Sequence, residues 1–132
     1  MQIEPKSGGC LCGSVRYTVS GPLRAITACH CSQCRKSTGS FYTSTSAADA
    51  HLAIAEAGVL RWYRSSAFAR RGFCGICGSN LFWKADGSPK TAITASTLDG
   101  DSGLAIAKHI FVADKGDYYE IAGDAPQHSG AG

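Results

Sequence analysis

Short stretches in which apolar and polar residues alternate recur along this chain. In residues 14–20 (SVRYTVS), Val15, Tyr17 and Val19 alternate with polar neighbours, and a Gly21–Pro22 turn follows. This pattern is typical of a strand with one buried face. Similar short segments predict further strands at residues 23–29, 41–46, 60–65, 67–73, 80–85, 91–96 and 109–113. About eight or nine short strands separated by turns indicate an all-β domain.

Two segments do not follow this pattern clearly. Residues 51–57 (HLAIAEA) combine helix-favouring Ala and Glu with an alternation that includes Leu52 and Ile54, and we interpret them as a strand. Residues 31–39 (CSQCRKSTG) allow at most one or two helical turns, which the glycine at position 39 ends. Because the chain shows no repeat or linker, we expect a single domain over residues 1–132, with roughly the last eight residues flexible.

Composition narrows the class of protein. A chain of 132 residues with 44% hydrophobic residues fits one domain with a small core. The net charge of +3 comes from scattered basic residues, which argues against a nucleic-acid-binding protein and is compatible with a small anionic substrate. Residues 1–9 do not resemble a signal peptide, and no apolar run approaches the ~18 residues that cross a bilayer. We therefore expect a soluble, cytoplasmic protein with no membrane partner.

The cysteines carry the clearest chemical pattern. There are seven of them, and an odd number does not fit a closed disulfide framework. In a reducing compartment, cysteines at very short spacings are typical of metal ligands. They form three groups, C-x-C at Cys10 and Cys12, C-x-C-x-x-C at Cys29, Cys31 and Cys34, and C-x-x-C at Cys74 and Cys77.

The grouping favours a division into four ligands and three. A structural zinc takes four thiolates, usually from two short clusters that lie far apart in the sequence. The N-terminal pair and the C-x-x-C pair supply such a set, and the middle group supplies three ligands within six residues. A zinc ribbon that combines two cysteines of the middle group with Cys74 and Cys77 is the alternative, and it leaves the N-terminal pair without a metal.

The middle group lies in the stretch CHCSQC (29–34), which also contains a histidine. Successive side chains of an extended segment point to opposite faces, so Cys29 and Cys31 share one face and His30 points away from it. We interpret His30 as a buried, hydrogen-bonded histidine rather than a fourth ligand. Three thiolates with a free fourth position are typical of catalytic zinc, and a substrate thiol matches that position in softness.

Other interpretations of the middle group remain open. His51 or His109 would close the site as a fourth ligand, or the three cysteines would be metal-free thiols. A thioredoxin-like redox pair lacks its βαβ context, and zinc-deaminase chemistry lacks an H-x-E motif.

Four blocks of the sequence, in this order, resemble the glutathione-dependent formaldehyde-activating enzyme family, also called the centromere protein V/GFA family. The blocks are GGCLCGSVRY (8–17), CHCSQCRKSTGS (29–40), FCGICGSNLFW (73–83) and HIFVADKGDYYEI (109–121). The resemblance implies a β-tent fold of short antiparallel strands and two zinc ions. It implies a structural zinc on Cys10, Cys12, Cys74 and Cys77, and a second zinc with an open position on Cys29, Cys31 and Cys34.

The resemblance also implies an activity, the carbon–sulfur lyase reaction that joins glutathione to formaldehyde or separates them. Glutathione carries two carboxylates, and Arg35 and Lys36 adjoin the open site, so we expect these two residues to bind substrate. Arg70 and Arg71 are further candidates.

A different class of protein also fits, a non-enzymatic β-tent module that binds a thiol compound or a protein partner. The sequence gives no indication of the oligomeric state. Three aromatic side chains are candidates for a pocket wall, Phe41, Phe82 and Trp83.

Overall fold

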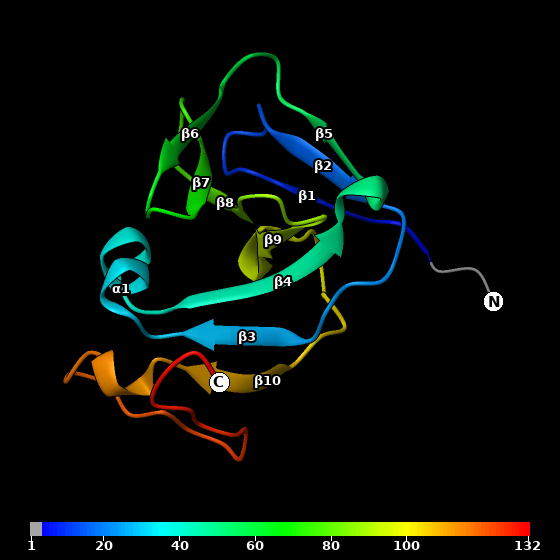
Figure 1. Ribbon diagram of the computed structural model, residues 1–132. Coiled ribbons are helices and arrows are strands. Elements are labelled where there is room, and N and C mark those ends of the chain that lie inside the picture. Colours follow the sequence, from blue (N-terminus) through cyan, green and yellow to red (C-terminus); the bar gives the residue numbers. More distant parts are fainter. Residues whose placement is uncertain (1–3) are drawn as a thin grey trace. The chain divides into compact units, whose positions relative to one another are not determined.

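The computed structural model describes residues 4–132, which form ten strands, one α-helix and three short 3₁₀ helices (Figure 1). The predominance of short strands confirms the all-β prediction. In chain order the elements are β1 (Lys6–Gly9), β2 (Arg16–Val19), β3 (Ile26–Cys29), α1 (Ser32–Thr38), β4 (Tyr42–Ala48), η1 (Asp49–His51), β5 (Leu52–Ala55), β6 (Leu60–Arg64), β7 (Ala69–Cys74), β8 (Asn80–Ala85), β9 (Lys90–Thr94), η2 (Ala95–Thr97), β10 (Ile106–Ile110) and η3 (Val112–Asp114).

The described chain divides into two compact units. Unit 1 contains the described residues up to Arg24 together with Thr45–Ser102, and unit 2 contains Ala25–Ser44 and Gly103–Gly132. Strand β4 begins in unit 2 and ends in unit 1. The single domain expected from chain length stays a prediction.

Unit 1 contains two antiparallel arrangements of strands. Strand β2 pairs with β1 on one side and β5 on the other, and β6, β7, β8 and β9 follow one another. In β2 the polar residues are exposed, whereas Tyr17 and Val19 are buried, as the alternation predicts. The Tyr17 ring meets the edge of the buried Phe82 ring at 5.7 Å between centroids, so the core of unit 1 includes residues of both arrangements.

In unit 2, β3 lies between β10 and the first residues of β4. The pairing of β3 with β4 is antiparallel, but that of β3 with β10 is parallel. The resemblance implied antiparallel strands, and this pair differs. Parallel neighbours need a long connection, and here the whole chain between residues 30 and 105 provides it.

One predicted strand ends earlier than expected, and one strand was not predicted. The segment 109–113 is strand only to Ile110, because Phe111 adopts a left-handed φ of 55° and η3 follows. The backbone amide of Phe111 donates to Gly130 O (2.8 Å) instead of continuing the β10–β3 ladder. Strand β1 (KSGG) was not predicted, because two glycines and two polar residues show no alternation.

Glycine at position 8 is a requirement of the packing around β1. A Cβ atom there would lie 2.3 Å from the carbonyl oxygen of Thr97 and 2.3 Å from the hydroxyl of Tyr17. These two partners are themselves joined, since the Tyr17 hydroxyl and the Thr97 hydroxyl are 2.7 Å apart. The alternation pattern therefore missed a strand in which a glycine allows neighbouring groups to approach closely.

The two ambiguous segments contain the predicted kinds of element, with shorter bounds for the strand. Residues 52–55 form β5, after a single 3₁₀ turn at Asp49–His51. The seven-residue helix α1 ends at Gly39, which has a left-handed φ of 95° and donates its amide to Arg35 O.

Near the C-terminus, where flexibility was expected, backbone atoms of Pro126 and His128 are hydrogen-bonded to His109. No helix formed by residues 4–132 is long and apolar enough to span a membrane.

Candidate metal centres

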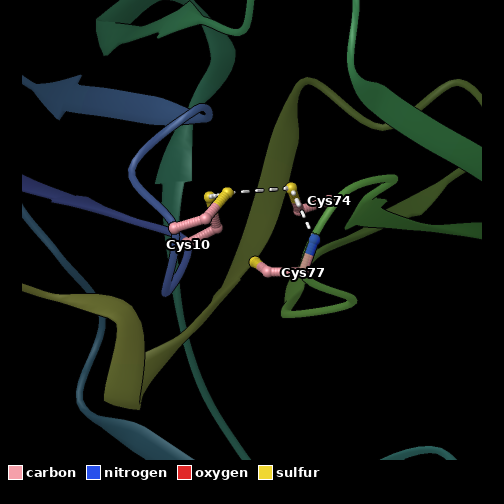
Figure 2. Close-up of side chains that lie close together, drawn as sticks. Cys10, Cys74 and Cys77 are labelled. Carbon is pink, nitrogen blue, oxygen red and sulfur yellow. Dashed lines mark hydrogen bonds between the residues drawn. The ribbon is translucent and has the colours of Figure 1, made fainter.

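Four cysteines meet in unit 1, as the division into four and three requires. Cys10 and Cys12 lie in the turn after β1, Cys74 ends β7, and Cys77 lies in the turn that follows (Figure 2). The four sulfur atoms all lie within 4.8 Å of one another. Cys12 Sγ is 3.6 Å from Cys10 Sγ and 3.7 Å from Cys74 Sγ. A tetrahedron with Zn–S bonds of about 2.3 Å has S···S edges of about 3.8 Å, so the cluster fits a zinc ion.

Backbone amides point at these sulfur atoms and favour their ionised form. Val15 N lies 3.3 Å from Cys10 Sγ, and the amides of Ile76 and Cys77 lie 3.4 and 3.5 Å from Cys74 Sγ. Ser79 links the two halves of the cluster, because its hydroxyl accepts the Leu11 amide (3.0 Å) and lies 3.2 Å from Cys77 Sγ. Such outer contacts orient metal ligands.

The electrostatics of this cluster suit a metal that binds thiolates. The hydroxyl and amide of Ser79 lower the pKa of Cys77 to about 5, and Ser14 lowers the pKa of Cys12 in the same way. In contrast, burial and the neighbouring thiols of Cys77 and Cys10 raise the pKa of Cys74. All seven cysteines are free of disulfides.

The other three cysteines meet in unit 2, around the start of helix α1. Cys29 ends β3, Cys31 is the N-cap of α1, and the buried Cys34 lies in its first turn. Their sulfur atoms lie within 4.8 Å of one another, and the Cys34 amide donates to Cys31 Sγ (3.3 Å). Among the described residues of unit 2, no histidine or carboxylate joins this cluster. The donor set is three soft sulfur atoms, which fits zinc with a fourth position left to another ligand.

Cys29 in the three-cysteine cluster holds its proton strongly. The neighbouring thiol of Cys34 and burial raise the pKa of Cys29 well above its usual range. A metal ion that binds to the Cys29 sulfur must displace this proton, so its affinity depends on pH.

His30 is buried and hydrogen-bonded, as its place between two cysteines of an extended stretch predicted. Its side chain has no exposed surface. The Nδ1 atom lies 2.7 Å from the hydroxyl of Tyr119, and Nε2 lies 3.0 Å from Nδ1 of His109. The contribution of Tyr119 was not predicted. The paired tyrosines at the end of the block HIFVADKGDYYEI are the one sequence feature that pointed to it.

The candidate substrate-binding cations have different environments. Arg35 is half-buried and donates from Nε to the carbonyl oxygen of Asp114 (2.9 Å), whereas Lys36 is exposed on α1. In unit 1, the guanidinium of Arg70 lies 4.5 Å from the centroid of the Trp62 ring, and Arg71 is buried.

The three aromatic candidates are also spread over both units. Phe82 is buried in the core of unit 1, and Trp83 meets the edge of Phe68 at 6.4 Å between centroids. Phe41 stacks on His30 in unit 2, with centroids 4.7 Å apart. Phe41 alone of the three therefore lies next to a residue of the CHCSQC stretch within its own unit.

Comparisons with known proteins agree with the cysteine pattern. The model of a family described as glutathione-dependent formaldehyde-activating enzyme matches residues 5–114. A Schizosaccharomyces pombe protein named as an uncharacterized lyase is 28% identical over 116 residues, which cover 87% of this chain and 84% of that protein. A crystal structure of a Rhodobacter sphaeroides protein is similar with a TM-score of 0.61 and 23% identity, over 92% of this chain and 98% of that chain. At 23% identity, this last similarity shows a shared fold alone.

Proposed function

Since this chain belongs to the glutathione-dependent formaldehyde-activating enzyme family, we propose that it is a zinc-dependent carbon–sulfur lyase that joins a thiol such as glutathione to a small aldehyde such as formaldehyde, or releases it. The lyase name of the Schizosaccharomyces pombe relative supports this reaction class. The observation that carries the proposal is the set of three adjacent thiols with no further protein ligand in the described part of unit 2.

The two clusters have separate roles in this proposal. Cys10, Cys12, Cys74 and Cys77 hold a structural zinc, because four thiolates complete its coordination. Cys29, Cys31 and Cys34 hold a second zinc and leave one position for the substrate thiol. A zinc ion in such a site lowers the pKa of a thiol that binds to it, so that the thiol reacts as a thiolate at neutral pH.

The reaction itself needs no oxidant or reductant. The substrate thiol loses its proton, its sulfur attacks the aldehyde carbon, the carbonyl π electrons move to oxygen, and the oxygen takes up a proton. One C–S bond forms, and the reverse sequence breaks it. The protein then contributes by binding the thiol and the aldehyde next to each other, which lowers the entropic part of the activation barrier.

Two cations near the three-cysteine cluster would bind the carboxylates of a glutathione-like thiol. Arg35 directs one nitrogen to Asp114 O, which fixes its side chain and leaves its terminal nitrogens as donors. Lys36 is exposed beside it on α1. We propose the cytoplasm as the compartment, because a reducing environment maintains free thiols.

Cobalt substitution tests the open site. We expect the protein to bind two Co²⁺ ions, and we expect added glutathione to change the visible absorption of one of them. Cys31→Ser is the matched variant and should lose the glutathione-sensitive band. A protein that binds one metal ion, or two that do not respond to thiols, would contradict the proposal.

A coupled assay then tests the substrates. Wild-type protein with glutathione and formaldehyde should form S-hydroxymethylglutathione faster than the uncatalysed background, and Lys36→Ala should raise KM for glutathione with little change in kcat. A thiol-sensitive cobalt band without turnover would favour the non-enzymatic alternative, a module that binds a thiol compound.

A further inference from the structure

Unit 2 contains a cluster of two buried and two half-buried rings that the proposed reaction does not use. We call it the His30 cluster, and its members are His30, Phe41, His109 and Tyr119. Phe41 and Tyr119 lie nearly parallel to the His30 ring, at interplanar angles of 28° and 27°. Both nitrogen atoms of His30 have hydrogen-bond partners, at 2.7 Å on Tyr119 and 3.0 Å on His109. The ring of His30 is thus stacked on Phe41 and held at both polar atoms.

The orientation of this ring is coupled to the two cysteines beside it. Cys29 ends a strand and Cys31 has extended backbone angles, φ −63° and ψ 160°. Because side chains alternate in an extended stretch, a His30 ring fixed on one face directs the flanking cysteines to the other face. The backbone is fixed at the same residue, since the His30 amide donates to Ile110 O (3.0 Å).

The two partners of His30 are themselves anchored. The Tyr119 hydroxyl lies 3.4 Å from the Gly116 amide, and Lys115 Nζ donates to Tyr119 O (2.7 Å). A side chain at position 116 would clash with Tyr119 and its neighbour Tyr118, because an added Cβ would lie 2.9 and 2.5 Å from their rings. His109 belongs to β10, and its backbone is hydrogen-bonded to Pro126 and His128. The chain of hydrogen bonds is therefore supported at both ends.

We propose that the hydrogen-bonded chain Tyr119–His30–His109 positions Cys29 and Cys31 so that the three-cysteine cluster holds its metal. His30 and Tyr119 are then positioning residues, which act through the cysteines and do not touch the substrate. This inference rests on the proposed function only in that the cluster binds a metal, and it does not depend on the aldehyde or on turnover.

Tyr119→Phe is the sharpest variant, because it removes one hydroxyl and keeps the ring that stacks on His30. Tyr118→Phe is the matched control, since it removes the hydroxyl of the adjacent tyrosine, which donates to Gly39 O (3.1 Å) and has no described contact with His30. Outer-shell substitutions typically cost 10–100-fold in metal affinity. We therefore expect Co²⁺ binding at the three-cysteine cluster to weaken about 10–100-fold in Tyr119→Phe and to stay unchanged in Tyr118→Phe.

Two further readouts separate positioning from a general loss of stability. The four-cysteine cluster serves as an internal reference, and its Co²⁺ affinity should be the same in all variants. His109→Asn keeps a hydrogen-bonding atom close to the position of Nδ1 and should retain more affinity than His109→Leu. Equal affinities in Tyr119→Phe and Tyr118→Phe would overturn the positioning role. A wild type that binds one metal would overturn this inference together with the proposed function, whereas two metals without turnover would affect the proposed reaction alone.

Discussion

Cys77 and Cys31 are both candidate zinc ligands, but the consequences of losing them differ. Cys77 belongs to a cluster that joins the turn after β1 to the end of β7, and its thiolate contacts Ser79. Cys31 belongs to a cluster formed within six residues of sequence. Structural zinc contributes apparent binding energies of about 10–16 kcal/mol in small zinc-dependent folds. Removal of one ligand from such a site should therefore greatly reduce the stability of the fold.

We therefore expect Cys77→Ser to give poorly folded protein and Cys31→Ser to give folded protein with one metal ion fewer. Metal analysis and circular dichroism of the purified variants provide the measurement. A folded Cys77→Ser together with an unfolded Cys31→Ser would mean that the structural and open clusters are assigned the wrong way round.

A second prediction at the scale of single residues concerns protonation of His109. Burial lowers the pKa of His109 below its ordinary value of 6.5. The unfolded chain then binds a proton at a higher pH than the folded one. Stability from this group is fully present above pH 6.5, falls as the pH drops below that value, and is fully lost only below the folded-state pKa, with a slope of at most about 1.4 kcal/mol per pH unit.

An NMR titration measures this directly. The imidazole resonances of His109, assigned by their absence in His109→Asn, should shift at a pH below 6.5. A midpoint above 6.5 would show that the folded protein favours the imidazolium, and it would reverse the sign of the pH dependence.

At the scale of elements, the packing around β1 gives a prediction about Gly8. The methyl group of Gly8→Ala would overlap the backbone oxygen of Thr97 and the hydroxyl of Tyr17, each 2.3 Å away. Overpacking of this kind costs about 1–3 kcal/mol. Urea denaturation should show a loss of that size. Gly130→Ala is the control, because a Cβ there would have no neighbour within 4 Å. Equal stability of the two variants would contradict the close approach.

Strands rich in β-branched, aromatic or alternating apolar residues could be predicted, whereas the glycine-rich β1 could not. Residues 80–85 were predicted with the bounds that β8 has, and β2 shows the alternation of buried and exposed residues. Strand β1 has no alternation, and β10 starts three residues before the predicted segment, at the exposed Ile106. β10 pairs with the distant strand β3, and Gly8 of β1 packs against the distant Thr97, and sequence periodicity does not report such contacts.

In the candidate site, too, features set by local sequence could be predicted and contacts between distant residues could not. The division of the cysteines into four and three could be predicted, because the ligands of a metal site have characteristic local spacings. The orientation of His30 could also be predicted, since it follows from alternation along an extended stretch. The partnership with Tyr119 could not, because 89 residues separate it from His30 and a tyrosine that contacts a histidine has no characteristic spacing in the sequence.

At the scale of the whole molecule, each unit carries one cysteine cluster, and the two clusters close very different lengths of chain. Cys12 and Cys74 are 62 residues apart, whereas the three-cysteine cluster lies within residues 29–34. Closing a 62-residue loop removes about 4 kcal/mol of unfolded-chain entropy at 25 °C in the chain-entropy model, and a local cluster removes much less. Loss of the metal from unit 1 should therefore destabilise the fold more than loss of the metal from unit 2.

Stepwise removal of zinc by a chelator tests this difference. The zinc held by three thiolates should leave first, because it has fewer protein ligands and an accessible position, and the thermal midpoint should change little. The zinc on the four-cysteine cluster should leave only at higher chelator concentration, together with a cooperative loss of β-sheet circular dichroism. Cys31→Ser is the control and should show only the second step. Simultaneous release of both ions, or release of both without unfolding, would contradict a structural role for the four-cysteine cluster.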